Sequence, residues 1–278
     1  MDGSECAKLQ RAKGQLSFHV SQKRVSRMFQ SGSAKLMLPK TYSDMMEAVI
    51  LNTSGGMTDG DILNIDVEAE GCALVMTTQT AERVYRSVGT KPAKIQINLS
   101  VSGTADLHWL PQETIVFNDS KFERTLKINL SSCSNCLVAE TIVLGRQAMG
   151  ENIYDCHLID NWRVFRDGNL FHAESLRLSD EVSKIIEAPA GGNGARLLST
   201  ILYIGDNLER IANRVSDVIK QSPSNCAVSC WNDRLIIRLM SSHSASARKD
   251  LEKLLIAIQN SQYRGSGRPN KQGVKNET

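Results

Sequence analysis

Carboxylate side chains are the residues of this chain best placed to do chemistry, because several lie beside or inside apolar segments. Glu140 is the strongest case, since it lies within the apolar run LVAETIVLG and a buried carboxylate is costly unless another group pairs with it. Any one of the other acids could equally be a surface residue or pair with an arginine such as Arg146 or Arg177. These other candidates are Asp59, Asp61, Asp66, Glu113 in LPQETIVF, Glu151 in MGEN and Glu174 in HAESLRL.

A glycine-rich stretch, ILNTSGGMTDGD at residues 50–61, resembles a phosphate-binding loop only superficially. The P-loop pattern requires a lysine that reaches the phosphates, and neither this stretch nor GGNGARLLST supplies one in the required position. Gly55, Gly56 and Gly60 permit positive φ angles and close backbone approach, which predicts a tight turn between strands. We therefore expect a turn that presents Asp61 on a rigid corner, and no nucleotide hydrolysis by this chain.

Cysteine and histidine residues give little support to a metal centre or a nucleophilic enzyme. Cys133 and Cys136 have C-x-x-C spacing, but no second pair follows at the distance typical of zinc sites. Cys156 and His157 would point to opposite faces of a strand. No G-x-S-x-G motif is present, so we expect a protein that is not an enzyme. One enzymatic alternative stays open, a β-rich hydrolase with a carboxylate pair such as Glu113 and Glu140 about 5 to 10 Å apart in an open cleft.

The elements that must position these residues are mostly strands. Apolar and polar residues alternate at residues 95–101 and 126–130, which predicts strands with one buried face. Asp167-Gly168 lies between two such runs and is typical of a type I′ hairpin turn. The sequence thus favours a mainly β protein with a stacked, β-helix-like, strand-rich body.

The last third of the chain has a different pattern. After the break APAGGNGA come an apolar strand and a helix with a capping-box-like start at Asp206 and Glu209. A hairpin at Asn232-Asp233 and a second amphipathic helix around residues 251–258 follow, which predicts a C-terminal α/β portion carrying two helices. We expect four parts: an N-terminal extension with the first strand (1–30), a β-rich body (31–188), the α+β portion (189–262) and a disordered tail (263–278).

Composition narrows the class of protein further. The net charge of +3 is small and the charges are interspersed, so a nucleic-acid or membrane partner is not expected. No apolar run reaches the roughly 18 residues of a membrane span, and the N-terminus lacks the apolar region of a signal peptide. Seven cysteines at irregular spacings fit reduced thiols. We therefore expect a cytoplasmic protein.

Five ordered motifs resemble the urease accessory protein UreD family, called UreH in some organisms. They are SGSAKLMLP, AVILNTSGGMTDGD, TTQTAERVYRS, LHWLPQETIVF and ETIVLGRQAMGE, and the resemblance runs from about residue 31 to 178, more loosely to about 260. Members often read G-G-D at the glycine stretch, commonly with a second glycine where this chain has Asp59. The resemblance implies the family's unusual stack of strands with a few helices.

The resemblance also implies a function, a non-catalytic chaperone role in urease maturation. Such a protein would bind the urease apoprotein and UreF, recruit the GTPase UreG through UreF, and assist nickel insertion, with two copies in a symmetric complex. It would hold no tightly bound cofactor, and nickel would pass transiently along an acidic internal passage. Matching positions are Asp61, Glu140 and Glu174, with Glu47, Asp59, Glu113 and Glu151 as weaker candidates.

Partner surfaces follow less directly from the residues. We expect UreF to contact the C-terminal portion and the broad strand face to meet urease, although the two helices could simply cover the sheet. A generic β-rich interaction module without a metal role is the second alternative. Exposed apolar interface would also predict poor solubility of the chain expressed alone.

Overall fold

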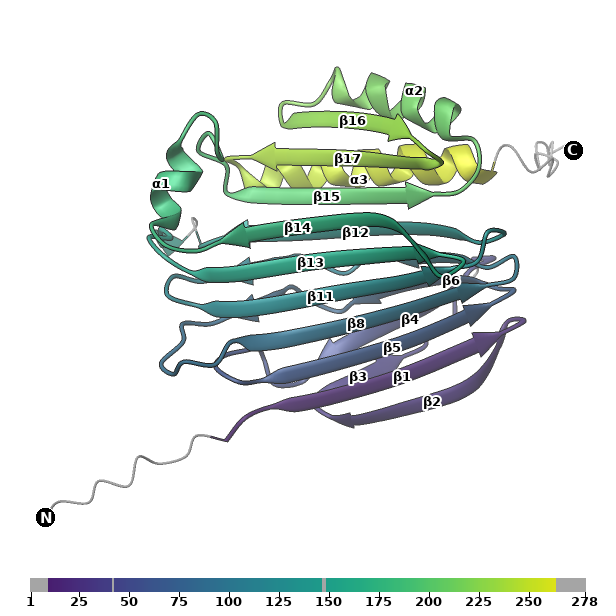
Figure 1. The fold of residues 1–278 in the computed structure, drawn as a ribbon, viewed down its shortest axis with the longest axis horizontal. Coiled ribbons are helices and arrows are strands. Elements are labelled where there is room, and N and C mark those ends of the chain that lie inside the picture. Colours follow the sequence, from purple (N-terminus) through teal and green to yellow (C-terminus); the bar gives the residue numbers. More distant parts are fainter. Residues whose placement is uncertain (1–9, 42, 147–148, 264–278) are drawn as a thin grey trace, which may run out of the picture.

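Two face-to-face β-sheets form the body of the protein in the computed structural model, which describes residues 10–41, 43–146 and 149–263 (Figure 1). The first sheet has seven strands, in spatial order β14 (Asn169–Leu178), β13 (His157–Arg166), β11 (Lys121–Leu130), β8 (Ala93–Ser102), β5 (Ile62–Glu70), β1 (Lys13–Ser21) and β2 (Arg24–Gly32). The predicted tail (263–278) lies outside the described residues apart from Tyr263. Of the predicted N-terminal extension (1–30), residues 10–30 are described.

The second sheet has ten strands in the described part of the chain. Its main path runs through β16 (Asn225–Trp231), β17 (Arg234–Ser241), β15 (Leu197–Ile204), β12 (Asn135–Leu144), β9 (Asp106–Trp109), β6 (Ala73–Thr78), β4 (Met46–Asn52) and β3 (Ala34–Met37). Two short strands, β7 (Glu82–Val84) and β10 (Thr114–Val116), pair with each other beside β12. Because β15 pairs with β12, the predicted C-terminal portion continues the same sheet as the body.

The chain alternates between the two sheets in a repeating manner. β5, β8, β11 and β13 are successive parallel neighbours in the first sheet, and β4, β6, β9 and β12 are parallel neighbours in the second. Each coil of the chain thus adds one strand to each sheet. This arrangement confirms the expected mainly β, β-helix-like stack, and the strand order follows from the pairing.

Alternation of side chains explains why the two sheets pack on each other. In β8 and β11, every second residue is buried, and the buried residues of both sheets share one apolar cluster between the layers. β12 is buried along both faces, because one face meets the first sheet and the other meets the helices. A strand of this kind can hold a side chain such as Glu140 at the centre of the molecule.

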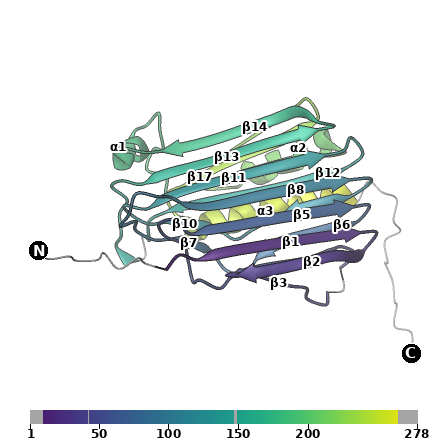
Figure 2. The ribbon, with the colours of Figure 1, turned by 60° about the horizontal axis from the view of Figure 1, so that its bottom comes forward.

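Three helices accompany the sheets in the described residues: α1 (Val182–Glu187), α2 (Leu208–Ile219) and α3 (Ser244–Tyr263). α2 and α3 contact each other and cover β15, β16 and β17. Figure 2 shows α3 behind the strands of the first sheet. Ile211, Val215, Leu254 and Ile258 of these helices belong to a second apolar cluster. The two predicted C-terminal helices are therefore present. α1 is a short additional helix that the sequence did not indicate.

Candidate functional site

A buried ionic cluster connects the two sheets. Arg124 of β11 pairs with Glu140 of β12, with Nη1 2.5 Å from Oε2, and with Asp160 of β13, with Nη2 2.6 Å from Oδ2 and Nε 3.0 Å from Oδ1. Indole N–H groups complete the cluster: Trp109 donates to Glu140 at 2.8 Å and Trp162 to Asp160 at 3.2 Å. Arg124 is 3% exposed and Glu140 4%, so the cluster is shielded from bulk solvent.

Strand parity places these side chains in the interior. Arg124 lies on the same face of β11 as the buried residues Phe122 and Leu126. Asp160 lies on the same face of β13 as Leu158 and Trp162. Side chains two residues apart on a strand share a face. The strands therefore direct a guanidinium and a carboxylate inward at positions where the pattern otherwise supplies apolar residues.

The cluster carries one more negative than positive charge when both carboxylates are ionised. Burial raises the pKa of Glu140 to about 7, because the favourable charge of Arg124 only partly offsets desolvation and the nearby charge of Asp160 opposes ionisation. Burial alone would lower the pKa of Arg124, but Asp160 and Glu140 raise it, so the guanidinium stays charged. Near neutral pH, the carboxyl group of Glu140 is therefore partly protonated.

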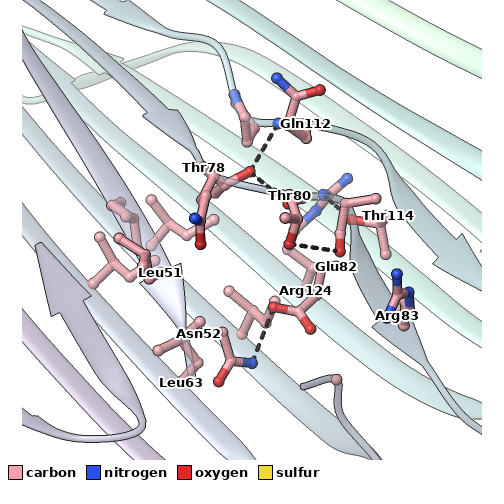
Figure 3. A pocket seen from close by; sticks show the side chains of 18 of the residues that line it. Leu51, Asn52, Leu63, Thr78, Thr80, Glu82, Arg83, Gln112, Thr114 and Arg124 are labelled. Atoms are coloured by element: carbon pink, nitrogen blue, oxygen red, sulfur yellow. Dashed lines mark hydrogen bonds between the residues drawn. The ribbon is translucent and has the colours of Figure 1, made fainter. Parts of the chain in front are cut away.

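A first cavity of about 110 Å³ lies on one side of Glu140 (Figure 3). Its walls include Arg124, Glu140, Thr114, Asn52, Glu82 and Gly56. Asn52 Nδ2 donates to Glu82 Oε2 at 3.0 Å. Figure 3 marks the hydrogen bond of Asn52 with a dashed line. Burial raises the pKa of Glu82 although the hydrogen bond from Asn52 opposes this rise. The cavity therefore has a carboxylate at Glu82 and another at Glu140.

A second cavity of about 210 Å³ lies between the sheets and is also lined by Glu140. Its walls include Asp160, Glu174, Thr200 and Arg238. Glu174 Oε2 accepts a hydrogen bond from Arg238 Nη2 at 2.6 Å, and the half-exposed Arg238 side chain lies at the solvent side of this pair. Glu140 therefore lines both cavities, together with Glu82 in the first and Glu174 in the second.

The structure thus brings two of the three main predicted residues, Glu140 and Glu174, into one cavity. Asp61 is buried, but it does not line either cavity: its Oδ1 accepts from Ala12 N–H at 2.7 Å and its Oδ2 from Thr58 N–H at 2.9 Å. Its charge nevertheless contributes, as the weakest cause, to the raised pKa of Glu82. Asp61 therefore closes the turn beside the first cavity.

The glycine-rich turn has the backbone that the sequence predicts. Gly55, Gly56 and Gly60 have φ angles of 78°, 143° and 68°, and Gly55 and Gly56 line the first cavity. Asp59 acts in the same region: its Oδ2 accepts backbone N–H groups from Val88, at 2.8 Å, and from Gly89. Burial would raise the pKa of Asp59, but these hydrogen bonds lower it, so the carboxylate stays ionised and holds the loop.

The weaker candidates lie away from the cluster. Glu113 is buried and forms an ion pair with Arg248 of α3. Glu140 instead faces the first sheet, and Glu113 lines neither of the two cavities that Glu140 lines. Glu151 pairs with Arg146 at 2.8 Å near the surface, and Glu47 is a half-buried residue of β4. The Glu113–Glu140 pair required by the hydrolase alternative thus has no shared cavity here.

Three residues of the site were missed from the sequence: Arg124, Asp160 and Glu82. The sequence pattern could have identified Arg124 and Asp160, because each charged residue stands in an alternating strand at a position where the other residues are apolar and buried. Glu82 lies in a strand of three residues, which is too short for a parity argument. Pairing between distant strands fixes its position instead.

Metal-ligating side chains do not converge within the described ranges: no group of three or more histidine, cysteine, aspartate or glutamate residues could hold an ion. Cys136 is buried, with its pKa raised by burial, while Cys133 is exposed, so the C-x-x-C pair does not form a shared site. Among the helices that the structure describes, none is both long and apolar enough to cross a membrane.

Comparisons with known proteins give consistent results. The family model described as UreD urease accessory protein matches residues 10–272. The chain is 38% identical over 239 residues to the urease accessory protein UreD of Rhizobium leguminosarum bv. viciae, covering 85% of this chain and 86% of the relative. It is 37% identical over 252 residues to that of Chelativorans sp. (88% and 89% covered), and 36% identical over 266 residues to that of Brucella suis (92% and 94% covered).

Proposed function

Because this chain belongs to the UreD family of urease accessory proteins, we propose that it is a non-catalytic scaffold for urease maturation. In this role it binds the urease apoprotein and UreF, recruits UreG through UreF, and assists nickel delivery in the cytoplasm. Two copies would take part in a symmetric complex. The observation that carries the nickel proposal is that two separate cavities share the buried carboxylate of Glu140.

Nickel would travel through the space between the sheets as cargo. Glu82 and Glu140 line the first cavity, and Glu140 and Glu174 line the second, so successive carboxylates are available along the route. Asp61 and Asp59 would contribute by fixing the turn and loop beside the first cavity. Glu47, Glu113 and Glu151, which line neither cavity, have no direct role in this route.

Transient binding is the property that such a route needs. Ni²⁺ has high affinity for nitrogen and sulfur ligands, so a closed cage of histidine and cysteine would retain it. Single carboxylates that are already hydrogen-bonded hold a cation weakly and release it. Arg124 supports this property, since it neutralises one of two buried acids and leaves the cluster with at most one net negative charge.

A generic interaction module is the remaining alternative. In that reading, Arg124, Glu140 and Asp160 only join the sheets, and partner binding alone accounts for the role of the chain. The two readings differ in one respect: a neutral isostere at Glu140 should impair nickel loading only if the carboxylate acts on the ion.

Co-expression with the urease structural and accessory genes tests the proposal. We expect deletion of this chain to abolish urease activity, and Glu140→Gln to lower nickel per urease active site several-fold while the chain still pulls down UreF. Glu123→Gln is the matched control, because Glu123 precedes Arg124 on β11 but pairs with Lys94 on the outer face. Active, nickel-loaded urease in the deletion strain would refute the maturation role, and full loading with Glu140→Gln would leave the module alternative.

A further inference from the structure

The strand β2 forms one edge of the seven-stranded sheet and has a single neighbour, β1, in the described residues. Figure 1 shows it at the bottom of the stack. In an antiparallel edge strand, alternate residues direct their N–H and C=O groups away from the sheet. β2 spans Arg24–Gly32, with a register shift against β1 between Val25 and Arg27, and thus offers a template for one more strand.

Apolar side chains are uncovered at the same edge. Phe18 of β1 and Met28 of β2 are register partners on the inner face, yet Phe18 is 0% exposed and Met28 is 48% exposed. The second sheet ends at the four-residue strand β3, which contacts β2 near Gln30 and leaves residues 24–29 of β2 exposed. Five of the twelve exposed large apolar side chains in the described residues gather at this edge, namely Val25, Met28, Phe29, Met37 and Leu38.

β3 is held close to this edge strand. The side-chain oxygen of Gln30 in β2 accepts a hydrogen bond from the N–H of Leu36 in β3 at 2.8 Å. Met37 and Leu38 directly follow Leu36, which places them at the same margin of the molecule. These five apolar residues and the strand β2 are called the β2 edge from here on.

Charge distinguishes the β2 edge from the rest of the chain. Residues 6–43 contain no aspartate or glutamate, although acids and bases are nearly balanced in the whole sequence. Arg24 and Arg27 are exposed residues of β2, and Lys23 precedes it in the turn. The bases in this segment are Lys8, Arg11, Lys13, Lys23, Arg24, Arg27, Lys35 and Lys40.

We propose that the β2 edge is a docking site for an extended, acid-bearing segment of a partner protein, which pairs with β2 as an eighth strand. Backbone pairing would supply affinity, the uncovered apolar side chains would receive alternate residues of the segment, and its acids would meet Arg24 and Arg27. A second copy of this chain fits less well, because antiparallel pairing of two β2 strands brings the bases of both copies together. The inference does not depend on nickel transport.

A pair of synthetic strands tests this proposal on the full chain. The probes are nine-residue fluorescein-labelled peptides in which valine alternates with glutamate or with lysine. We expect the glutamate peptide to bind at least about tenfold more tightly in fluorescence anisotropy at low salt, with the difference shrinking at high salt as screening increases. Backbone amides of β2 should gain protection from hydrogen exchange only with the glutamate peptide.

A charge-reversed variant makes the test specific. Arg24→Glu combined with Arg27→Glu should reverse the preference toward the lysine peptide. Arg177→Glu, an exposed position on β14 at the opposite edge of the sheet, should leave the preference unchanged. Absence of binding, equal binding of both peptides, an unchanged preference in the double variant, or dimerisation of the free chain through β2 would each overturn the proposal.

Discussion

Arg124 is the residue on which the interior depends, because its guanidinium contacts carboxylates from both sheets. From the sequence, Glu140 could be identified as a costly buried acid, but its partner could not. The pairing joins residues 16 and 36 positions apart, through strands whose neighbours are set by the coiling of the whole chain. Local alternation predicts which face of a strand is buried, but it does not predict which other strand packs against that face.

Loss of the Arg124 charge should destabilise the protein strongly. Arg124→Met leaves Glu140 and Asp160 as two buried acids without a cation, and removal of one partner of a buried pair costs about 3–5 kcal/mol. The free energy of unfolding, measured by urea titration, should fall by that order at pH 8. The loss should shrink toward pH 5.5, since protonation removes the buried charge. A loss of under about 1 kcal/mol at pH 8 would contradict the importance of this cluster.

The pKa of Glu140 predicts a definite sign for the pH dependence of stability. Its pKa is about 7 in the folded protein and near the ordinary value of 4.5 when unfolded, so the folded state holds the extra proton between these values. Stability contributed by this group is therefore highest below about pH 4.5 and is lost as the pH rises through 7. Relative to the wild type, Glu140→Gln should gain unfolding free energy on the order of 2 kcal/mol from pH 5.5 to 8. A pH-independent difference would mean that Glu140 stays ionised throughout.

Strands, turns and helices were predictable to different degrees. Positive φ angles at Asp167 and Gly168 (49° and 80°) and at Asn232 and Asp233 (42° and 58°) confirm both predicted hairpin turns. The predicted capping box does not form: Asn207 is the N-cap of α2, in the left-handed region, without a side-chain cap bond. Turn chemistry is local, whereas the capping box fails because Asn207, and not Asp206, occupies the N-cap position.

The glycine turn offers a prediction at the level of an element. A Cβ at Gly56 would fall 2.8 Å from the Arg83 carbonyl oxygen and collide with Tyr85, whereas a Cβ at Gly55 meets no atom within 4 Å. Gly56→Ala should thus cost more than the 1–3 kcal/mol typical of backbone strain alone, and Gly55→Ala about 1 kcal/mol. Thermal unfolding of the two variants provides the comparison. Equal losses would show that the close approach to β7 and Tyr85 is not needed.

At the scale of the whole molecule, the two sheets enclose cavities lined in part by carboxylates and leave one edge uncovered. The mainly β stack could be anticipated from alternation and from the family resemblance. The uncovered edge could not, because exposure of Met28 depends on where the opposite sheet ends. A chain with several exposed apolar side chains at one edge should precipitate readily when it is produced without its partners.

Solubility of the isolated chain should therefore respond to the β2 edge. We expect Met28→Thr with Phe29→Thr to raise the concentration at which the purified chain precipitates by about twofold or more. Val88→Thr with Leu170→Thr removes two exposed apolar side chains elsewhere and should change it little. The protein that stays in the supernatant after centrifugation of a concentration series measures the difference. Equal solubility of both double variants would mean that the apolar side chains of this edge do not limit it.

Blocking the space between the sheets is the most direct test of nickel passage. Thr200 of β15 is paired with Glu140 of β12 and lines the second cavity, so Thr200→Trp would fill part of its 210 Å³. The control, Thr125→Trp, places the same side chain on the exposed outer face of β11. The measurement is nickel bound per active site after transfer to urease apoprotein in the purified accessory complex, with UreF retention as the folding control. Passage through the interior predicts a several-fold loss for Thr200→Trp and none for Thr125→Trp. Equal, complete loading with both variants would contradict it.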